Sequence, residues 1–308
     1  MQRFKKQIFQ LLETQKTAIT FSSAFNDFKQ LTKVGLSMSV VFSSIAGYLL
    51  AVETVDYTIL LLLAVGGYLM VGASNAFNQI IEIETDALMK RTKDRPLPAG
   101  RMSVATAMTI AIVFTIIGIG ILYYINPKCA LFGAISIFLY TSAYTPLKSV
   151  TPLSVFVGAI PGAIPFMLGW VAATGTFSIE PGTLFLIQFF WQFPHFWAIG
   201  WLQFDEYKKA GFNMMPMGKK DKAAIRQIVL YTVVMMLVSI IPVLKLTGDF
   251  WIYPATAVII LLMGGLMLYY AVKLYKYQTD KIARQLMLSS VLYITLIQII
   301  YVVDKFLH

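Results

Sequence analysis

Long apolar segments separated by short polar loops dominate the pattern of this chain. Nine such segments of roughly 17 to 23 residues recur, each long enough for an α-helix to cross the hydrocarbon core of a bilayer. They lie near residues 36–53, 58–80, 104–125, 129–146, 152–173, 182–203, 228–246, 251–272 and 285–303. The pattern predicts an all-α integral membrane protein in which residues 1–308 form a single domain of nine transmembrane helices.

The first 30 residues depart from this pattern. Phe4, Ile8, Leu11 and Leu12 repeat at helical spacing and are opposed by a basic and polar face. A helix of this kind lies in the membrane interface rather than across the bilayer. We therefore expect residues 1–30 to form an amphipathic arm on the cytoplasmic surface.

Composition agrees with a membrane protein and also orients it. Apolar residues make up 58% of the chain and charged residues 13%, whereas soluble domains contain about 25% charged residues. The net charge of +10 could indicate a nucleic-acid partner, but all basic residues except Lys128, Lys245 and Lys305 lie in the N-terminal arm and the even-numbered loops. This bias is typical of cytoplasmic loops. It predicts a multi-pass protein of the cell inner membrane, with its N-terminus in the cytoplasm and its C-terminus outside, and no nucleic-acid partner.

The loop after the second apolar segment carries the clearest candidate chemistry. Asn78, Glu82 and Asp86 follow one another at four-residue steps, which a helix would place on one face. Amide and carboxylate oxygens suit Mg²⁺, which usually keeps several waters and bridges to substrate phosphates. We interpret these three side chains as catalytic, metal-binding residues.

Basic side chains follow these oxygen ligands directly. Lys90, Arg91 and Arg95 belong to the same loop, and Lys148 lies in the fourth loop. Ammonium and guanidinium groups bind the anionic oxygens of phosphates. We therefore predict a Mg²⁺-dependent diphosphate site at the cytoplasmic end of the helices.

The sixth apolar segment and its end carry a second set of candidates. His195 lies inside this segment, and its position alone favours an imidazole that is hydrogen-bonded to a neighbouring helix. Asp205 and Glu206 follow at the cytoplasmic end. They could bind a second Mg²⁺, orient basic groups or form a plain solvated helix end.

These motifs resemble those of the UbiA superfamily of intramembrane prenyltransferases. Its first signature, Asn-x-x-x-Asp/Glu-x-x-x-Asp followed by Met-x-Arg-Thr-x-x-Arg-Pro-Leu-Pro-x-Gly, is matched by residues 78–100. Within the superfamily the chain is most similar to the protohaem IX farnesyltransferases, or haem O synthases. That narrower resemblance rests on YTSAYTPLKSVTP, GAIPGAIPFMLGW and WQFPHFWAIGWLQFDEYKKAGFNMMP. Glu82 departs from the Asp of many members, and Ser149 from the Arg that usually follows the lysine.

The resemblance implies a UbiA-type bundle with a lateral opening to lipid and Mg²⁺ as cofactor. It implies transfer of a farnesyl group from farnesyl diphosphate to a vinyl group of haem B, with water addition, giving haem O and diphosphate. His195 then becomes a candidate axial ligand or near neighbour of haem, while aligning the vinyl group or supplying a proton is equally open. Haem A synthase or the assembly of terminal oxidases would be the expected protein partners.

Three alternatives remain from the residues. A sister prenyltransferase would use an aromatic quinone precursor, although the Pro-His-Phe-Trp segment argues against it. A secondary transporter would carry its polar site near the bilayer midplane, whereas the acids here lie at helix ends. A non-catalytic membrane protein that handles haem could use His195, but it would leave Asn78, Glu82 and Asp86 without a role.

Overall fold

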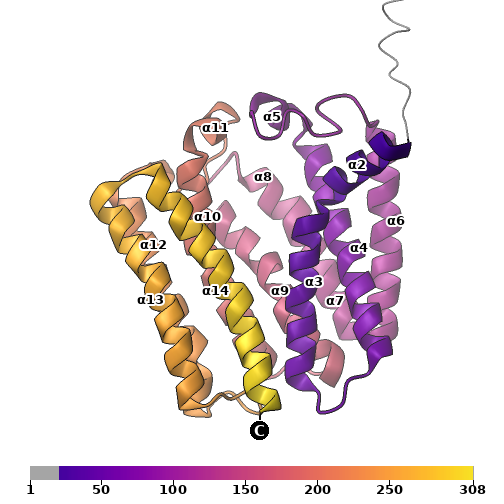
Figure 1. Cartoon of the computed structure of the whole chain (residues 1–308). Helices are drawn as coiled ribbons and strands as arrows, with labels where there is room; N and C mark the ends of the chain where they lie inside the picture. The colour runs from indigo at the N-terminus through magenta and orange to yellow at the C-terminus, as the bar shows by residue number, and fades with distance from the viewer. Residues whose placement is uncertain (1–20, 308) are drawn as a thin grey trace, which may run out of the picture.

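The computed structural model describes residues 21–307, and within these residues the chain forms only helices and connecting loops (Figure 1). Residues 1–20 of the expected N-terminal arm lie outside the described part of the chain. The helices are α2 (Phe21–Thr32), α3 (Val34–Ala51), α4 (Tyr57–Ile81), α5 (Ile83–Leu88), α6 (Val104–Ile125), α7 (Pro127–Phe138), η1 (Leu139–Tyr144), α8 (Thr145–Leu147), α9 (Ser154–Thr174), α10 (Ile179–Leu202), α11 (Phe204–Lys209), η2 (Pro216–Gly218), α12 (Lys222–Ile240), η3 (Ile241–Leu244), α13 (Pro254–Tyr277) and α14 (Asp280–Phe306).

The described residues include eight helices that are long and apolar enough to cross a membrane, counting α7 to α8 and α12 to η3 as one helix each. The chain is therefore a multi-pass membrane protein. The remaining predicted segment, residues 182–203, corresponds to α10. This helix is equally long, but Gln188, Gln192 and His195 lower its hydropathy. The count of nine spans stays a prediction.

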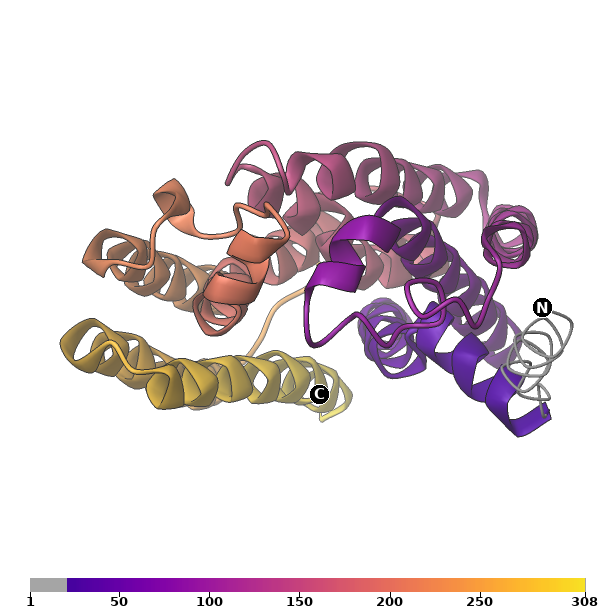
Figure 2. The ribbon, with the colours of Figure 1, turned by 90° about the horizontal axis from the view of Figure 1, so that it is seen from above.

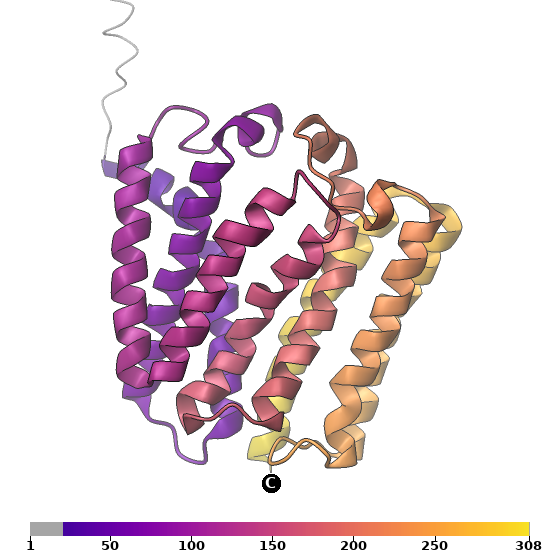
Figure 3. The same ribbon diagram turned by 180° about the vertical axis from the view of Figure 1, so that it is seen from behind.

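The long helices run along one common direction, with α7 and α9 tilted, as the view from behind shows (Figure 3). The short helices α5 and α11 lie together at one end of the bundle (Figure 1). Seen from that end, both lie near the middle of the molecule (Figure 2). The two loops that carry the candidate acids are thus brought side by side.

Capping side chains define where several helices begin. Asp56 accepts hydrogen bonds from the backbone N–H groups of Thr58 and Ile59 at the start of α4. Ser103 and Asn126 cap α6 and α7 in the same way. Such caps satisfy N–H groups that have no partner inside the helix, so the loop composition sets the helix starts.

Helices α3 and α9 approach each other closely through two glycines. A Cβ atom on Gly47 would lie 2.0 Å from the carbonyl oxygen of Phe166, and one on Gly169 would lie 1.9 Å from that of Ser44. Small residues at helix interfaces permit this approach. The resulting van der Waals contacts stabilise helix pairs in lipid, where no hydrophobic driving force acts between helices. The close packing fixes α9 against α3 at the centre of the bundle.

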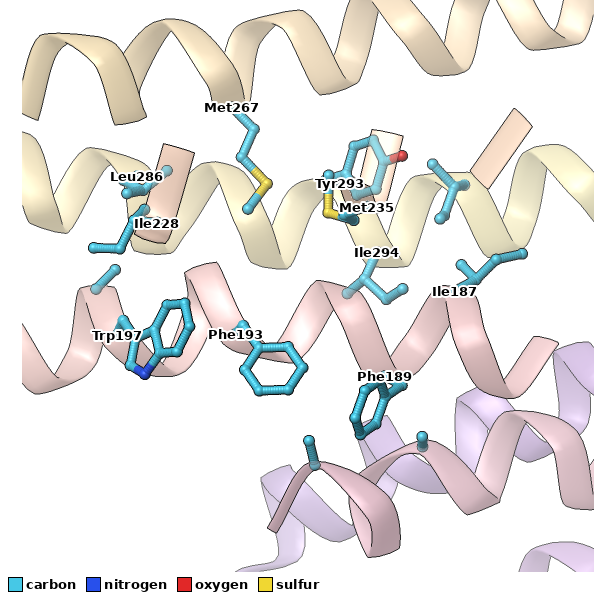
Figure 4. Packing of buried hydrophobic residues seen from close by; sticks show 14 of the residues in the cluster. Ile187, Phe189, Phe193, Trp197, Ile228, Met235, Met267, Leu286, Tyr293 and Ile294 are labelled. Carbon is cyan, nitrogen blue, oxygen red and sulfur yellow. The ribbon is translucent and has the colours of Figure 1, made fainter. Parts of the chain in front are cut away.

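The second half of the bundle packs around α10. Buried side chains of α10 meet those of α12, α13 and α14 in a continuous cluster (Figure 4). Phe189 and Phe193 form an edge-to-face pair with ring centroids 5.1 Å apart, an arrangement that aromatic quadrupoles favour. Phe189 and Phe193 also pack against Phe156 of α9, whereas Gln188 and His195 bond to side chains of α14.

Candidate active site

A cavity of about 600 Å³ lies in the bundle and is lined by α3, α4, α9, α10, α14 and the loop that follows α5. Its lining includes Asn78, Glu82 and Asp86 together with His195. Leu36 of α3 and Val291 of α14 also line it, and both are exposed on the outer surface. The cavity therefore extends from the acidic residues to exposed side chains of α3 and α14.

The predicted oxygen ligands occupy one wall of this cavity, although the helix that carries them is not continuous. Helix α4 ends at Ile81, and Glu82 has the non-helical angles φ −99° and ψ 16° before α5 begins. The backbone N–H of Glu82 still bonds to the carbonyl of Asn78 at 3.0 Å, and that of Asp86 to the carbonyl of Glu82 at 2.7 Å. These two bonds preserve the four-residue spacing across the kink.

Each of the two acids is paired with a cation. Lys148 Nζ lies 2.7 Å from Glu82 Oε1, and Arg95 Nη1 lies 2.6 Å from Asp86 Oδ2. Glu82, Asp86 and Lys148 are buried. Burial raises the pKa of Asp86, and the guanidinium of Arg95 opposes that rise. Two predicted diphosphate-binding residues, Lys148 and Arg95, thus lie directly against the predicted metal ligands.

Two oxygen atoms of this wall lack a donor among the described residues. Asp86 Oδ1 is buried without a hydrogen bond. Asn78 donates from Nδ2 to Thr145 Oγ1 at 3.2 Å, and no described residue donates to its Oδ1. A buried carboxylate oxygen without a partner is costly unless it meets a cation.

These oxygens fit a magnesium ion of the diphosphate-bridging type. Within residues 21–307 no three His, Cys, Asp or Glu side chains come together as a metal site. A bound ion would therefore use Asp86, Glu82 and the Asn78 amide, and would take its remaining ligands from water or phosphate. Mg²⁺ binds proteins in this way, with one or two carboxylates and several other oxygens.

A further cation, absent from the predicted site residues, lies at the start of α3. Lys33 lines the cavity and has φ 46° and ψ 58°, a left-handed conformation that is uncommon for a residue with a Cβ. No carboxylate within residues 21–307 forms an ion pair with it. Burial, together with repulsion from Arg95 and Lys148, lowers its pKa to about 7. The only sequence signal was a lysine directly before the first apolar segment.

The remaining loop candidates are placed differently. Arg91 lines the cavity, whereas the exposed Lys90 is not among its lining residues. The Lys90 backbone N–H instead donates to Glu206 Oε2 at 2.7 Å, and Lys209 Nζ donates to Glu206 Oε1. These bonds lower the pKa of Glu206. Asp205 is exposed and also lies outside the cavity lining. Glu206 therefore connects the two loops and does not belong to the wall that carries the predicted metal ligands.

His195 faces the cavity from α10. Its Nδ1 lies 2.8 Å from Ser290 Oγ of α14, and its ring stacks on Trp191 with centroids 4.7 Å apart. The expected hydrogen bond to a neighbouring helix is therefore present, and the imidazole also lines the same cavity as the acids. The position of His195 is therefore compatible both with a packing role, through its hydrogen bond to α14, and with contact to a haem in the cavity.

Known proteins are similar to this chain in sequence. The UbiA prenyltransferase family model matches residues 40–297. "Protoheme IX farnesyltransferase" of Christiangramia forsetii is 65% identical, over 93% of this chain and 96% of its own length. The protein of the same name from Flavobacterium johnsoniae is 60% identical, over 96% of this chain and 100% of its own length.

Solved structures agree on the fold. A structure of digeranylgeranylglyceryl phosphate synthase has a TM-score of 0.76 at 18% identity and covers 92% of this chain and 99% of its own. A UbiA homologue from Archaeoglobus fulgidus bound to DMAPP and Mg²⁺ has a TM-score of 0.63 at 15% identity, covering 90% and 99%. The chain therefore belongs to the UbiA prenyltransferase family.

Proposed function

We propose that this chain transfers the farnesyl group of farnesyl diphosphate to a vinyl group of haem B, with addition of water, to form haem O and diphosphate. Relatives that are 60% and 65% identical over nearly their whole length carry the name protoheme IX farnesyltransferase. The observation that carries the proposal is one continuous cavity that joins a set of acids and cations to an apolar interior containing His195.

The polar wall is suited to a prenyl diphosphate. We infer that Asn78, Glu82 and Asp86 hold Mg²⁺, which would neutralise the diphosphate as it leaves. Lys148, Arg95 and Arg91 line the same space and would bind the remaining phosphate oxygens. Lys33 is a fourth cation on this wall, and among the described residues no carboxylate forms an ion pair with it.

The apolar part of the cavity is suited to the other half of the reaction. An allylic cation is captured by water unless water is excluded, and a buried cavity with mostly apolar walls excludes it. The opening between α3 and α14 provides an entry path for two membrane-soluble substrates. His195 lies on the acceptor side of this space, where we propose that it contacts the haem.

The orientation in the membrane follows the same proposal. The end of the bundle that carries α5 and α11 also carries most of the basic loop residues, so we place it in the cytoplasm of a cell whose inner membrane holds the protein. The C-terminus would then lie outside. Haem A synthase or the assembly of terminal oxidases would receive the product.

Chromatography of haem extracted from membranes that express this chain tests the proposal. We expect a more hydrophobic haem with the intact chain and only haem B with Asp86→Asn at equal expression. Abundant folded protein that yields only haem B would exclude haem as the acceptor. The same membranes would then be assayed with aromatic quinone precursors, because the diphosphate site serves that alternative equally well.

A further inference from the structure

The contacts of Ser290 favour one tautomer of His195. Ser290 Oγ lies 2.6 Å from the carbonyl oxygen of Met287, which can only accept a hydrogen bond. A hydroxyl has one hydrogen, so a serine that donates to Met287 accepts from His195 Nδ1, which lies 2.8 Å away. This network favours the neutral imidazole that is protonated on Nδ1 and has its free lone pair on Nε2.

Trp191 holds the same pair in place. Its Nε1 donates to the Ser290 carbonyl at 2.7 Å, while its ring stacks on His195 at an interplanar angle of 19°. Ser290 is fully buried, so water does not compete for its hydroxyl. Two residues thus fix the ring plane and the tautomer of a histidine on the cavity wall.

The cavity wall between His195 and the start of α10 carries polar side chains. An isoprenoid tail on its own would need no polar groups around it. Gln188 lies two helical turns before His195 on α10, and Gln298 of α14 donates to Gln188 Oε1 at 3.1 Å and to Ser43 Oγ at 3.2 Å. Both glutamines are buried and line the cavity. Within residues 21–307, the Gln188 amide nitrogen has no acceptor, so it is available to bind a water molecule.

His195 lies further inside its own helix than Asn78 does. It precedes the end of α10 by seven residues, whereas Asn78 precedes the end of α4 by three. At a rise of 1.5 Å per residue, these separations are about 10 Å and about 5 Å along the respective helix axes. Both side chains line the same cavity.

From this geometry we propose that His195 Nε2 accepts the proton of the water molecule that adds to the prenylated vinyl group, and that Ser290 positions it by keeping Nε2 unprotonated. The inference rests on the proposed function. It gives His195 a role that the resemblance did not name, since accepting a proton is the reverse of supplying one, and it gives Ser290 a role that the sequence did not indicate.

The bond changes balance without any redox partner. The carbon–oxygen bond of the prenyl diphosphate breaks and its electron pair leaves with diphosphate. The vinyl π-electrons form the new carbon–carbon bond, which leaves a cation on the carbon next to the porphyrin ring. Water forms a carbon–oxygen bond to that carbon and loses a proton to His195 Nε2. Without this base, the same cation would instead lose a proton from carbon to the departing diphosphate and give an alkene.

Other groups on the cavity wall are less suited to this step. Glu82 and Asp86 are each paired with a cation at the diphosphate end. Lys148 and Arg95, as cations, have no lone pair to offer. Lys33, whose pKa is lowered to about 7, lies at the diphosphate end beside these groups. His195 is the imidazole that lines the cavity from α10.

The test measures the ratio of hydrated product to alkene by mass spectrometry of haem made by purified protein in lipid. The alkene is lighter by the mass of one water. We expect Ser290→Ala to lower this ratio about tenfold or more, since a positioned general base contributes at least that much. Ser290→Thr retains the hydroxyl and should restore the ratio. His195→Gln should give the alkene even if Ser290→Ala fails to fold.

A buried serine elsewhere provides the control. Ser239 of α12 is also fully buried and donates to the carbonyl of Met235 at 2.8 Å, but it does not line the cavity. Ser239→Ala should leave the ratio unchanged. An unchanged ratio in both Ser290→Ala and His195→Gln, with prenylated haem still formed, would overturn this inference alone. Absence of any prenylated haem from the unmodified protein would overturn the proposed function as well.

Discussion

The ion pair between Lys148 and Glu82 gives a direct test of how the site is stabilised. The two charged atoms lie 2.7 Å apart, and the side chains are 9% and 7% exposed. Lys148→Met keeps the aliphatic stem beside Tyr144 and removes only the charge. Glu82 then remains buried without a cation, so we expect the free energy of unfolding to fall by about 3–5 kcal/mol when no metal is present.

Removing both charges should reverse most of this loss. The double variant Lys148→Met with Glu82→Gln leaves no uncompensated buried charge, so its stability should lie closer to that of the unmodified protein. Lys220→Met is the matched control, because Lys220 pairs with Asp280 at 2.9 Å with side chains 27% and 64% exposed. We expect that change to cost only about 0–1 kcal/mol.

The assay is thermal unfolding of the purified variants in detergent, with and without Mg²⁺. Because a divalent ion at Glu82 would replace the missing ammonium, Mg²⁺ should stabilise Lys148→Met more than it stabilises the unmodified protein. Two results would refute the reasoning. One is a double variant whose loss equals the sum of the two single losses, and the other is an equal Mg²⁺-induced shift in every variant.

Three further changes test other parts of the structure. Asp86→Asn should abolish prenyl transfer while the protein stays folded, and retained turnover would contradict its role as a metal ligand. Lys33→Gly should raise the free energy of unfolding by about 1 kcal/mol, because glycine adopts the left-handed backbone without strain. The same change should raise KM for the prenyl diphosphate. A rise in stability with unchanged KM would assign Lys33 no part in binding. Gly169→Ala should lower stability by about 1–3 kcal/mol or more, because its Cβ would lie 1.9 Å from a carbonyl oxygen of α3. Gly265→Ala on α13 meets nothing within 4 Å and should be neutral or stabilising by up to about 1 kcal/mol in the same melting assay.

The helices could be predicted from sequence because each apolar segment must satisfy its own backbone hydrogen bonds inside the bilayer. Segment 58–80 corresponds to α4 at Tyr57–Ile81, and segment 104–125 coincides with α6. The prediction is weakest at α10, where polar residues that face the cavity lower the hydropathy. The same polar residues that line the cavity therefore also weaken the membrane signal of this helix.

The shared face of Asn78, Glu82 and Asp86 could be predicted because their spacing is local, and the kink at Glu82 leaves that spacing intact. Their partners could not, because they come from distant parts of the chain. Lys148 reaches Glu82 across 66 positions, and Ser290 reaches His195 across 95. By pattern alone, Ser290 is indistinguishable from a serine whose hydroxyl bonds only within its own helix, as that of the neighbouring Ser289 does.

The cost of burying the two acids also explains why each of them lies beside a cation. Burial of a bare carboxylate costs several kcal/mol, and Glu82 and Asp86 are paired with Lys148 and Arg95. Under the proposed function, a prenyl diphosphate bound with Mg²⁺ would offer the cations phosphate oxygens and the acids a metal ion. Binding would then exchange one set of opposite-charge contacts for another and leave no charge bare. For the same reason, Lys148→Met should weaken prenyl diphosphate binding even though Glu82 stays in place to hold the metal.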